Sequence, residues 1–137
     1  MPYFFPQDAL HREPVAQGLN EWINYPSVDA QCPGLFAARA TIAPDMGHDF
    51  HLHPGREEII YVLQGAIEQW VGRERRILRV GDTALVPSGR VHASFNVGAT
   101  EAVLFVVLTP AASDEPLAID VSAEAPWNTL RAESDAT

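Results

Sequence analysis

Short segments in which apolar and polar residues alternate run through the middle of the chain, and glycine and proline residues separate them. Alternation of this kind sends successive side chains to opposite faces of a β-strand. The segments between the glycines and prolines show no helical periodicity. The pattern therefore predicts an all-β sandwich or barrel with antiparallel strands. The predicted strands are residues 35–42, 50–53, 58–63, 66–71, 76–80, 84–86, 91–96 and 102–108.

The two ends of the chain differ from this central part. Residues 1–34 contain five of the eleven prolines and no long periodic segment, so we expect an N-terminal arm. We expect it to pack on a barrel formed by residues 35–110. Residues 111–137 carry prolines, acidic residues and one tryptophan and predict a C-terminal arm, whose residues 131–137 we expect to be frayed. A chain of 137 residues is long enough for one domain and too short for two ordinary ones.

Two histidines and a glutamate stand close together near the middle of the chain. His51 and His53 are two residues apart, so they project to one side of an extended segment. Pro54 and Gly55 predict a turn, after which Glu58 begins a strand and can return to the side that the histidines occupy. Imidazole nitrogens and a carboxylate oxygen suit a divalent transition metal. The alternative is a histidine-rich hairpin exposed on the surface.

A third histidine lies in a second alternating segment. His92, Ser94 and Asn96 share one face of the strand predicted at residues 91–96. A lone histidine on a strand is more often a structural, hydrogen-bonded residue than a metal ligand. Adjacent or facing strands of the predicted barrel can, however, bring His92 to the same ion as His51 and His53.

Three further polar residues have open roles. Gln69 shares a strand face with two apolar residues, so it is available to a ligand if that face lines the barrel, and it is exposed if the strand is an edge strand. Arg39 interrupts an apolar strand and either clamps an anionic substrate from inside or lies on the outer face. His48 is three residues from His51 and has the opposite strand parity, so we expect it to be a solvent-facing loop residue.

Charge and cysteine content restrict the partners and the compartment. Eighteen acidic and nine basic residues give a net charge of −9, which disfavours binding to nucleic acids and to anionic membranes. The single cysteine, Cys32, cannot form an internal disulfide, which fits a reducing compartment. The N-terminus lacks the pattern of a signal peptide, and no stretch approaches ~18 consecutive apolar residues. We therefore expect a cytoplasmic protein without nucleic-acid or membrane partners.

Two spaced motifs within residues 47–96 resemble those of the cupin superfamily. The first motif consists of His51, His53, four residues, Glu58, six residues and Gly65. The second consists of Gly81, five residues, Pro87, one residue, Gly89, two residues, His92, three residues and Asn96. The first motif departs from the family pattern at its initial glycine, where this chain has Asp45. The resemblance implies an antiparallel jelly-roll barrel and one divalent metal bound by His51, His53, Glu58 and His92.

The resemblance also implies a range of activities. Cupins with three histidines and one glutamate include dioxygenases of flavonols and related enols, oxalate-degrading enzymes and isomerases, and the same fold serves binding proteins. We expect first an iron or manganese dioxygenase of a small enol, diketone or phenolic compound; nickel, zinc, copper and cobalt are the other candidate metals. Glu58 would act as ligand and proton acceptor, and Gln69, Ser94, Asn96 and Arg39 are the candidate substrate-binding residues. A non-catalytic binding protein and a metal-assisted isomerase or decarboxylase are the alternatives.

Apolar residues also fall on the predicted outer faces of the strands, namely Tyr61, Leu63, Trp70 and Phe95. Such residues need another sheet, an arm or a subunit to cover them. A homodimer is therefore possible, and cover by the two arms of the same chain is the alternative. Because ligand histidines must be neutral, we expect metal to be lost as the pH falls below about 6.

Overall fold

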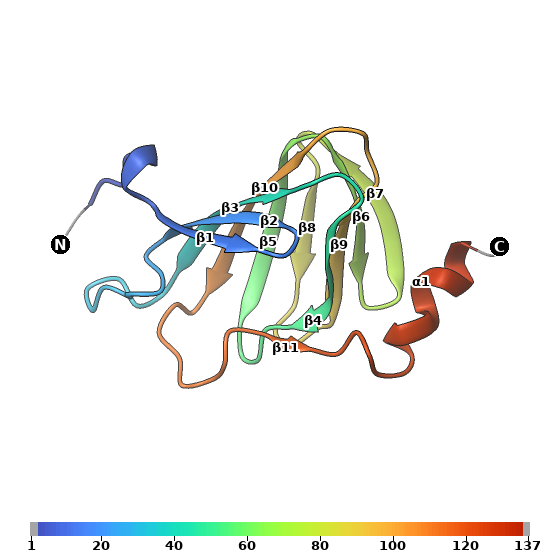
Figure 1. Cartoon of the computed structure of the whole chain (residues 1–137). Coiled ribbons are helices and arrows are strands. Elements are labelled where there is room, and N and C mark those ends of the chain that lie inside the picture. The colour runs from blue at the N-terminus through green and yellow to red at the C-terminus, as the bar shows by residue number, and fades with distance from the viewer. Residues whose placement is uncertain (1–2, 136–137) are drawn as a thin grey trace.

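The computed structural model describes residues 3–135, which form two antiparallel β-sheets that face each other (Figure 1). The strands are β1 (His11–Val15), β2 (Gly18–Ile23), β3 (Phe36–Ile42), β4 (Gly47–Leu52), β5 (Glu57–Gln64), β6 (Ala66–Val71), β7 (Glu74–Arg79), β8 (Thr83–Val86), β9 (His92–Asn96), β10 (Ala102–Thr109) and β11 (Ile119–Asp120). One sheet has the order β1-β2-β3-β10-β5-β8 and the other β11-β4-β9-β6-β7. The predicted all-β jelly roll is confirmed.

Alternating side chains fill the space between the sheets. Strand β5 shows this directly, because Glu58, Ile60 and Val62 are buried while the residues between them are exposed. One buried cluster contains Ile60 and Val62, and another, further along the sheet, contains Trp22 and Phe36. The period of two therefore places the Glu58 carboxylate inside the barrel.

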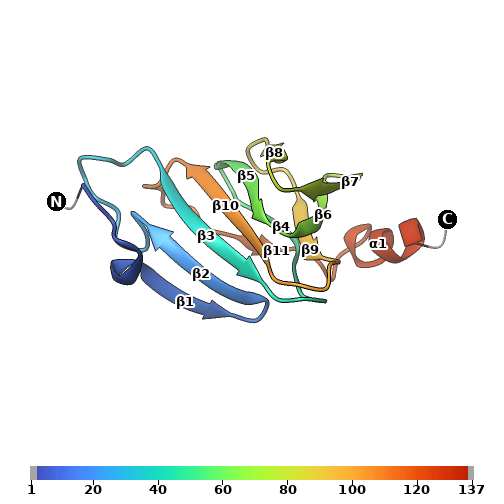
Figure 2. The same cartoon turned by 90° about the horizontal axis from the view of Figure 1, so that it is seen from above.

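The N-terminal segment adds a hairpin to the six-stranded sheet. Strands β1 and β2 pair with each other, and β2 pairs with β3, so the hairpin extends this sheet at one edge (Figure 2). A short 3₁₀ helix, η1 (Gln7–Ala9), precedes it. Trp22 and Tyr25, two of the aromatic residues of this segment, pack on Phe36 with ring centroids 5.8 and 4.9 Å from its ring. The expected arm thus includes two strands of the barrel wall.

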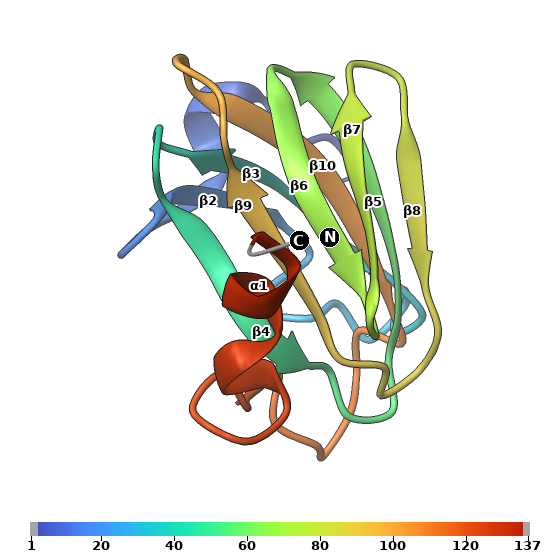
Figure 3. The same cartoon turned by 90° about the vertical axis from the view of Figure 1, so that its right-hand side faces the viewer.

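The C-terminal segment covers the outer face of the five-stranded sheet. It ends in helix α1 (Trp127–Asp135), which lies over this face (Figure 3). Trp70 and Phe95, predicted to face outward, are buried there in a cluster with Val121, against which Trp127 packs. The chain itself therefore supplies cover for these two residues. Tyr61 and Leu63, on the outer face of the other sheet, each remain 40% exposed.

One ion pair fastens helix α1 to the sheet. Arg131 Nε donates to Glu68 Oε2 at 2.7 Å, and its guanidinium lies 3.9 Å from the centroid of the Phe95 ring. Residues 131–135, for which we expected fraying, form the last part of helix α1, and residues 136–137 lie outside the described part. Within residues 3–135, no helix combines the length and the apolar composition that a membrane crossing requires.

Candidate metal site

Strands β4 and β9 bring the three predicted histidines together. His51 on β4 is the cross-strand partner of His92 on β9, and His53 follows the last residue of β4. Their ligand atoms all lie within 4.8 Å of one another, and all three residues are buried. A single ion can therefore contact the three imidazoles at once.

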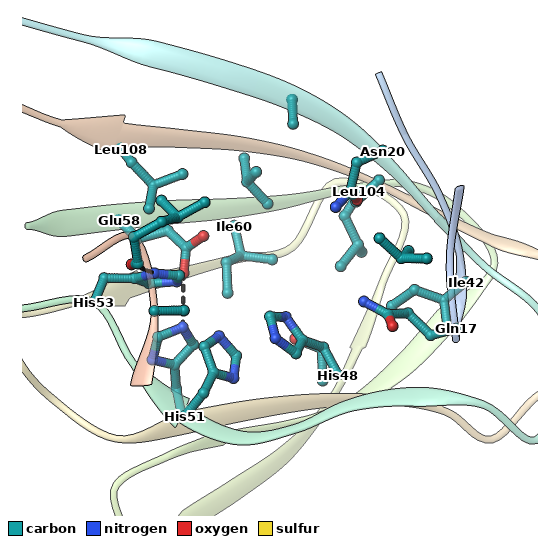
Figure 4. Close-up of a pocket in the computed structure, with 18 of the residues that line it drawn as sticks. Gln17, Asn20, Ile42, His48, His51, His53, Glu58, Ile60, Leu104 and Leu108 are labelled. Atoms are coloured by element: carbon teal, nitrogen blue, oxygen red, sulfur yellow. Dashed lines mark hydrogen bonds and ion pairs between the residues drawn. The ribbon is translucent and has the colours of Figure 1, made fainter. Parts of the chain in front are cut away.

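Glu58 reaches the same place from the opposite sheet (Figure 4). Its Oε1 atom lies 2.8 Å from His92 Nε2 and 3.6 Å from His53 Nε2. Neither Glu58 Oε1 nor His92 Nε2 has a hydrogen-bond partner within the described residues, so the 2.8 Å contact lacks the alignment of a hydrogen bond. The carboxylate thus faces the histidines at contact distance.

Backbone carbonyls fix the orientation of all three imidazoles. The contacts are His51 Nδ1 to Asp49 O at 2.7 Å, His53 Nδ1 to Leu117 O at 2.7 Å and His92 Nδ1 to Arg90 O at 2.9 Å. A carbonyl only accepts, so each neutral ring carries its hydrogen on Nδ1 and presents a lone pair at Nε2. Buried lone-pair atoms that face a carboxylate are costly unless a cation lies among them. The residues therefore fit a divalent transition metal.

The charge states of the cluster also suit a metal. Burial alone would raise the pKa of Glu58, but the neighbouring His53 and His92 outweigh burial and hold the pKa well below its usual range. Burial, reinforced by the other histidines, lowers the pKa of His51 well below its usual value. Burial would also lower the pKa of His53, but the Glu58 carboxylate beside it outweighs burial and raises this pKa. A proton on His53 therefore competes with a metal ion.

His48 joins this cluster contrary to the predicted strand parity. The pairing of β4 with β9 has an irregularity between His48 and His51, which resets the alternation of side chains. The His48 ring stacks on the His51 ring, with centroids 3.5 Å apart and an interplanar angle of 13°. His48 is therefore a residue of the cavity wall on β4, where it lies between His51 and Gln17 (Figure 4), although the residue as a whole remains exposed. Burial of the ring, followed by repulsion from neighbouring histidines, lowers its pKa.

A cavity of about 330 Å³ extends from the histidines between the two sheets. Ile60, Leu104 and Leu108 form apolar parts of its wall, and Gln17 and Asn20 lie at its far end (Figure 4). Among the described residues that line the cavity, none is a lysine or an arginine. The ion itself would be the one strong positive charge in this space.

Two of the candidate substrate-binding residues form a pair beside the cavity. Ser94 lines the cavity, and its Oγ donates to Gln69 Oε1 at 2.6 Å. Gln69 in turn donates through Nε2 to the Trp70 carbonyl at 3.0 Å. The edge-strand alternative for Gln69 is wrong, because β6 lies between β9 and β7 and the side chain is buried. Gln69 thus orients the Ser94 hydroxyl.

The structure places the other two candidates away from the cavity. Asn96 Nδ2 donates to the carbonyls of Ile42 and Thr100 at 2.9 and 2.8 Å, so its amide fastens the loop that follows β9. Arg39 is exposed on the outer face of the six-stranded sheet, where its Nε lies 3.9 Å from Glu21 Oε1. Neither residue lines the cavity that contains the histidines.

Arg56 supports the site in a way that the sequence does not show. It is 4% exposed and donates to three carbonyls, those of Pro110 (3.0 Å), Pro116 (3.2 Å) and Ala111 (3.2 Å). These bonds hold residues 110–116, and the carbonyl of the next residue, Leu117, accepts from His53. In the sequence, Arg56 precedes two glutamates after a turn, a pattern that equally fits a solvated charge.

Comparison with known proteins agrees with this fold and site. The model of the cupin domain family matches residues 38–108, which is slightly more than half of the chain and includes all four candidate ligands. The resemblance predicted from the two motifs is therefore confirmed.

Individual relatives match more of the chain, at identities of 23% to 30%. Oxalate oxidase 1 from Hordeum vulgare is 30% identical over 112 residues, covering 67% of this chain and 56% of that protein. The chain spans about half the length of the curated relatives it matches. The structure of KdgF from Halomonas sp. has a TM-score of 0.70 and 23% identity and covers 83% of this chain and 98% of that one, which shows a shared fold. A recombinant oxalate oxidase in complex with glycolate has a TM-score of 0.58 and 29% identity and covers 64% of this chain and 46% of that one.

Proposed function

The chain belongs to the cupin domain family, and we propose that it is a metal-dependent dioxygenase of a small enol, diketone or phenolic compound. His51, His53, His92 and Glu58 would hold the metal, with iron or manganese favoured. The observation that carries the proposal is that these four groups converge at one end of an otherwise largely apolar cavity. Four protein ligands would leave room on such an ion for substrate oxygens or dioxygen, and the bound ion would supply Lewis-acid and redox chemistry there.

The cavity wall indicates the kind of substrate. A lining without lysine or arginine offers no cationic side chain to a negative charge away from the ion. Ile60, Leu104 and Val106 suit an apolar carbon skeleton. Enols, diketones and phenols combine such a skeleton with oxygen atoms that bind a metal, and a cavity of about 330 Å³ holds a small molecule of this class.

Glu58 is the candidate proton acceptor for the substrate hydroxyl. It is the carboxylate at the histidine end of the cavity, and its lowered pKa keeps it ionised at neutral pH. The contacts with His53 and His92 that lower this pKa also make Glu58 a weak base. Glu58 would therefore accept a proton only after its contact with His92 lengthens, which fits a residue that changes between ligand and base.

Similarity to oxalate oxidase 1 supports a second candidate, the oxidation of oxalate or a related small acid. The cavity favours the first candidate. Oxalate carries two negative charges and no apolar part, so the apolar wall formed by Ile60, Leu104 and Val106 would remain unused. Oxalate therefore belongs in any panel of test substrates.

The test is oxygen uptake by protein purified anaerobically and loaded with iron(II) or manganese(II). We expect stoichiometric metal and uptake with at least one of acetylacetone, catechol and a flavonol. His51→Ala should abolish uptake, whereas the matched variant His11→Ala, at an exposed position on β1 outside the cavity lining, should retain it. Uptake that survives His51→Ala, or metal far below one ion per chain in the wild-type protein, would contradict the proposal. Metal binding that raises the melting temperature without any oxygen uptake would indicate the non-catalytic alternative.

A further inference from the structure

A second group of polar side chains lies at the end of the cavity opposite His51, His53 and Glu58. Gln17 and Asn20 belong to the β1–β2 hairpin and line the cavity. Figure 4 shows both residues across the cavity from Glu58 and His53, with Ile60 between the two ends. The cavity thus has a candidate metal-binding end, a middle that Ile60 and His48 line, and an amide end.

The two amides are held in place but have no protein partner. The Gln17 carbonyl accepts from Ala43 N at 2.9 Å, and Asn20 lies between Glu13 on β1 and Ala40 on β3 in the sheet. Within residues 3–135, neither side-chain amide makes a hydrogen bond or an ion pair. Both residues are half-buried. Amides that are fixed at the backbone, partly removed from water and unpaired are available to a ligand.

Charge at this end excludes an anionic group. Glu13, an exposed residue, also lines the cavity and is the cross-strand partner of Asn20. With no lysine or arginine in the described lining, a carboxylate or phosphate placed here would meet a like charge and no cation. Gln17 and Asn20 each offer both hydrogen-bond donors and an acceptor, which complements a carbonyl, amide or hydroxyl group.

With the proposed function as its premise, we propose that Gln17 and Asn20 determine specificity by binding an uncharged polar group at the distal end of the substrate. The substrate class is then an enol, diketone or phenol that binds the metal through its oxygens and carries a carbonyl, amide or hydroxyl group across an apolar body. The hairpin lies outside residues 38–108, the range matched by the family model. Recognition of the distal group is thus a property of the N-terminal segment of this chain.

The test uses full-length protein loaded with Zn²⁺, which binds catechols without oxidising them, and measures Kd by calorimetry. The probes are catechol, 4-ethylcatechol, 3,4-dihydroxyphenylacetamide and 3,4-dihydroxyphenylacetate, which share the metal-binding end and differ in the distal group. We expect the amide to bind about threefold to tenfold more tightly than the ethyl and carboxylate probes, the range for one net hydrogen bond. Gln17→Met and Asn20→Leu keep the side-chain size, and each should reduce this preference by about threefold. Gln64→Met, at an exposed position outside the cavity lining, is the matched control.

The outcomes separate this inference from the proposed function. Binding of unsubstituted catechol reports an intact metal site in every variant, together with Zn²⁺ stoichiometry, and should not change. Wild-type protein that holds no Zn²⁺, or a loaded protein that binds no catechol, overturns the proposed function and the inference with it. Catechol binding without an amide preference, or a preference that survives in the Gln17→Met, Asn20→Leu double variant, overturns the inference alone. Tighter binding of the carboxylate probe also overturns it.

Discussion

The two ends of the cavity are built differently. At the metal end, His51, His53 and His92 are buried, and each Nδ1 contacts a backbone carbonyl. At the hairpin end, Gln17 and Asn20 are half-buried, and their amides are unpaired within the described residues. A metal ion requires several donors in fixed positions, whereas an organic substituent can be met by side chains that adjust. The difference suggests that the metal end fixes the chemistry and the hairpin end selects the substrate.

The family model matches the residues of the metal end and not those of the hairpin end. Residues 38–108 include every candidate metal ligand but neither Gln17 nor Asn20. Changes at the metal end should therefore remove metal, and changes at the hairpin end should leave metal in place.

The largest effect is expected from His92→Ala. This change removes one of the four candidate ligands and the contact of its Nε2 with Glu58 Oε1 at 2.8 Å. We expect the affinity for Co²⁺ or Zn²⁺ to fall by more than ~100-fold, since loss of a supporting contact alone typically costs ~10- to 100-fold. Competition with a fluorescent chelator measures it, and His11→Ala serves as the control. Equal affinities in the two variants would show that His92 is not a ligand.

Arg56→Met tests whether the metal end depends on its supporting contacts. The variant keeps the apolar stem but loses all three bonds to the carbonyls of residues 110, 111 and 116, so the carbonyl that holds His53 is less well fixed. We expect ~10-fold weaker metal binding and a loss of ~2 to 4 kcal/mol in the free energy of unfolding, because bonds from a charged donor are lost and buried acceptors are left unpaired. Denaturant unfolding and the chelator assay measure the two effects. Weaker stability with unchanged metal affinity would limit Arg56 to a role in the fold.

The pH dependence of the metal-free protein should separate histidines with opposite shifts. The pKa of His51 is lowered from 6.5, so below that pH the unfolded chain takes up a proton that the folded protein excludes, and stability falls. The pKa of His53 is raised, so its contribution is present below 6.5 and is lost as the pH rises through the raised value.

Melting temperatures between pH 7 and pH 5, in the presence of a chelator, test this assignment. His51→Gln should reduce the loss of stability on acidification, because glutamine takes up no proton in the unfolded chain. His53→Gln should increase the loss, because the favourable protonation is removed. Identical pH profiles for the two variants would contradict the opposite shifts.

Much of the metal end could be predicted from the sequence because three of its four candidate ligands lie close together in the chain. His51 and His53 have the spacing of a strand, and the turn at Pro54 and Gly55 returns Glu58 to the same side, as the structure shows. His48 could not be placed this way, because parity holds only while a strand is regular and the irregularity of β4 depends on its pairing with β9.

Contacts between residues far apart in the sequence could also not be predicted. Arg131 of helix α1 donates to Glu68, and the Arg56 side chain donates to carbonyls more than fifty residues away in the sequence. The sequence correctly predicted that Trp70 faces away from the barrel interior. It did not predict that the C-terminal segment buries Trp70, because the composition of that segment alone indicates an irregular arm. For the same reason, Asn96 lies in a cupin motif and yet uses its amide on the chain itself.

The smallest effect on metal binding is expected at His48. Its ring stacks on His51 at a centroid distance of 3.5 Å, but the residue is exposed and lies outside the group of buried histidines whose ligand atoms converge. His48→Gln keeps a polar side chain of similar reach and removes the stacking, so we expect metal affinity to change by less than ~3-fold, the scale of one weak contact. The chelator assay with wild-type protein and His92→Ala in parallel measures this difference. A loss comparable to that of His92→Ala would make His48 a ligand, and the metal end of the cavity would then include a fourth histidine.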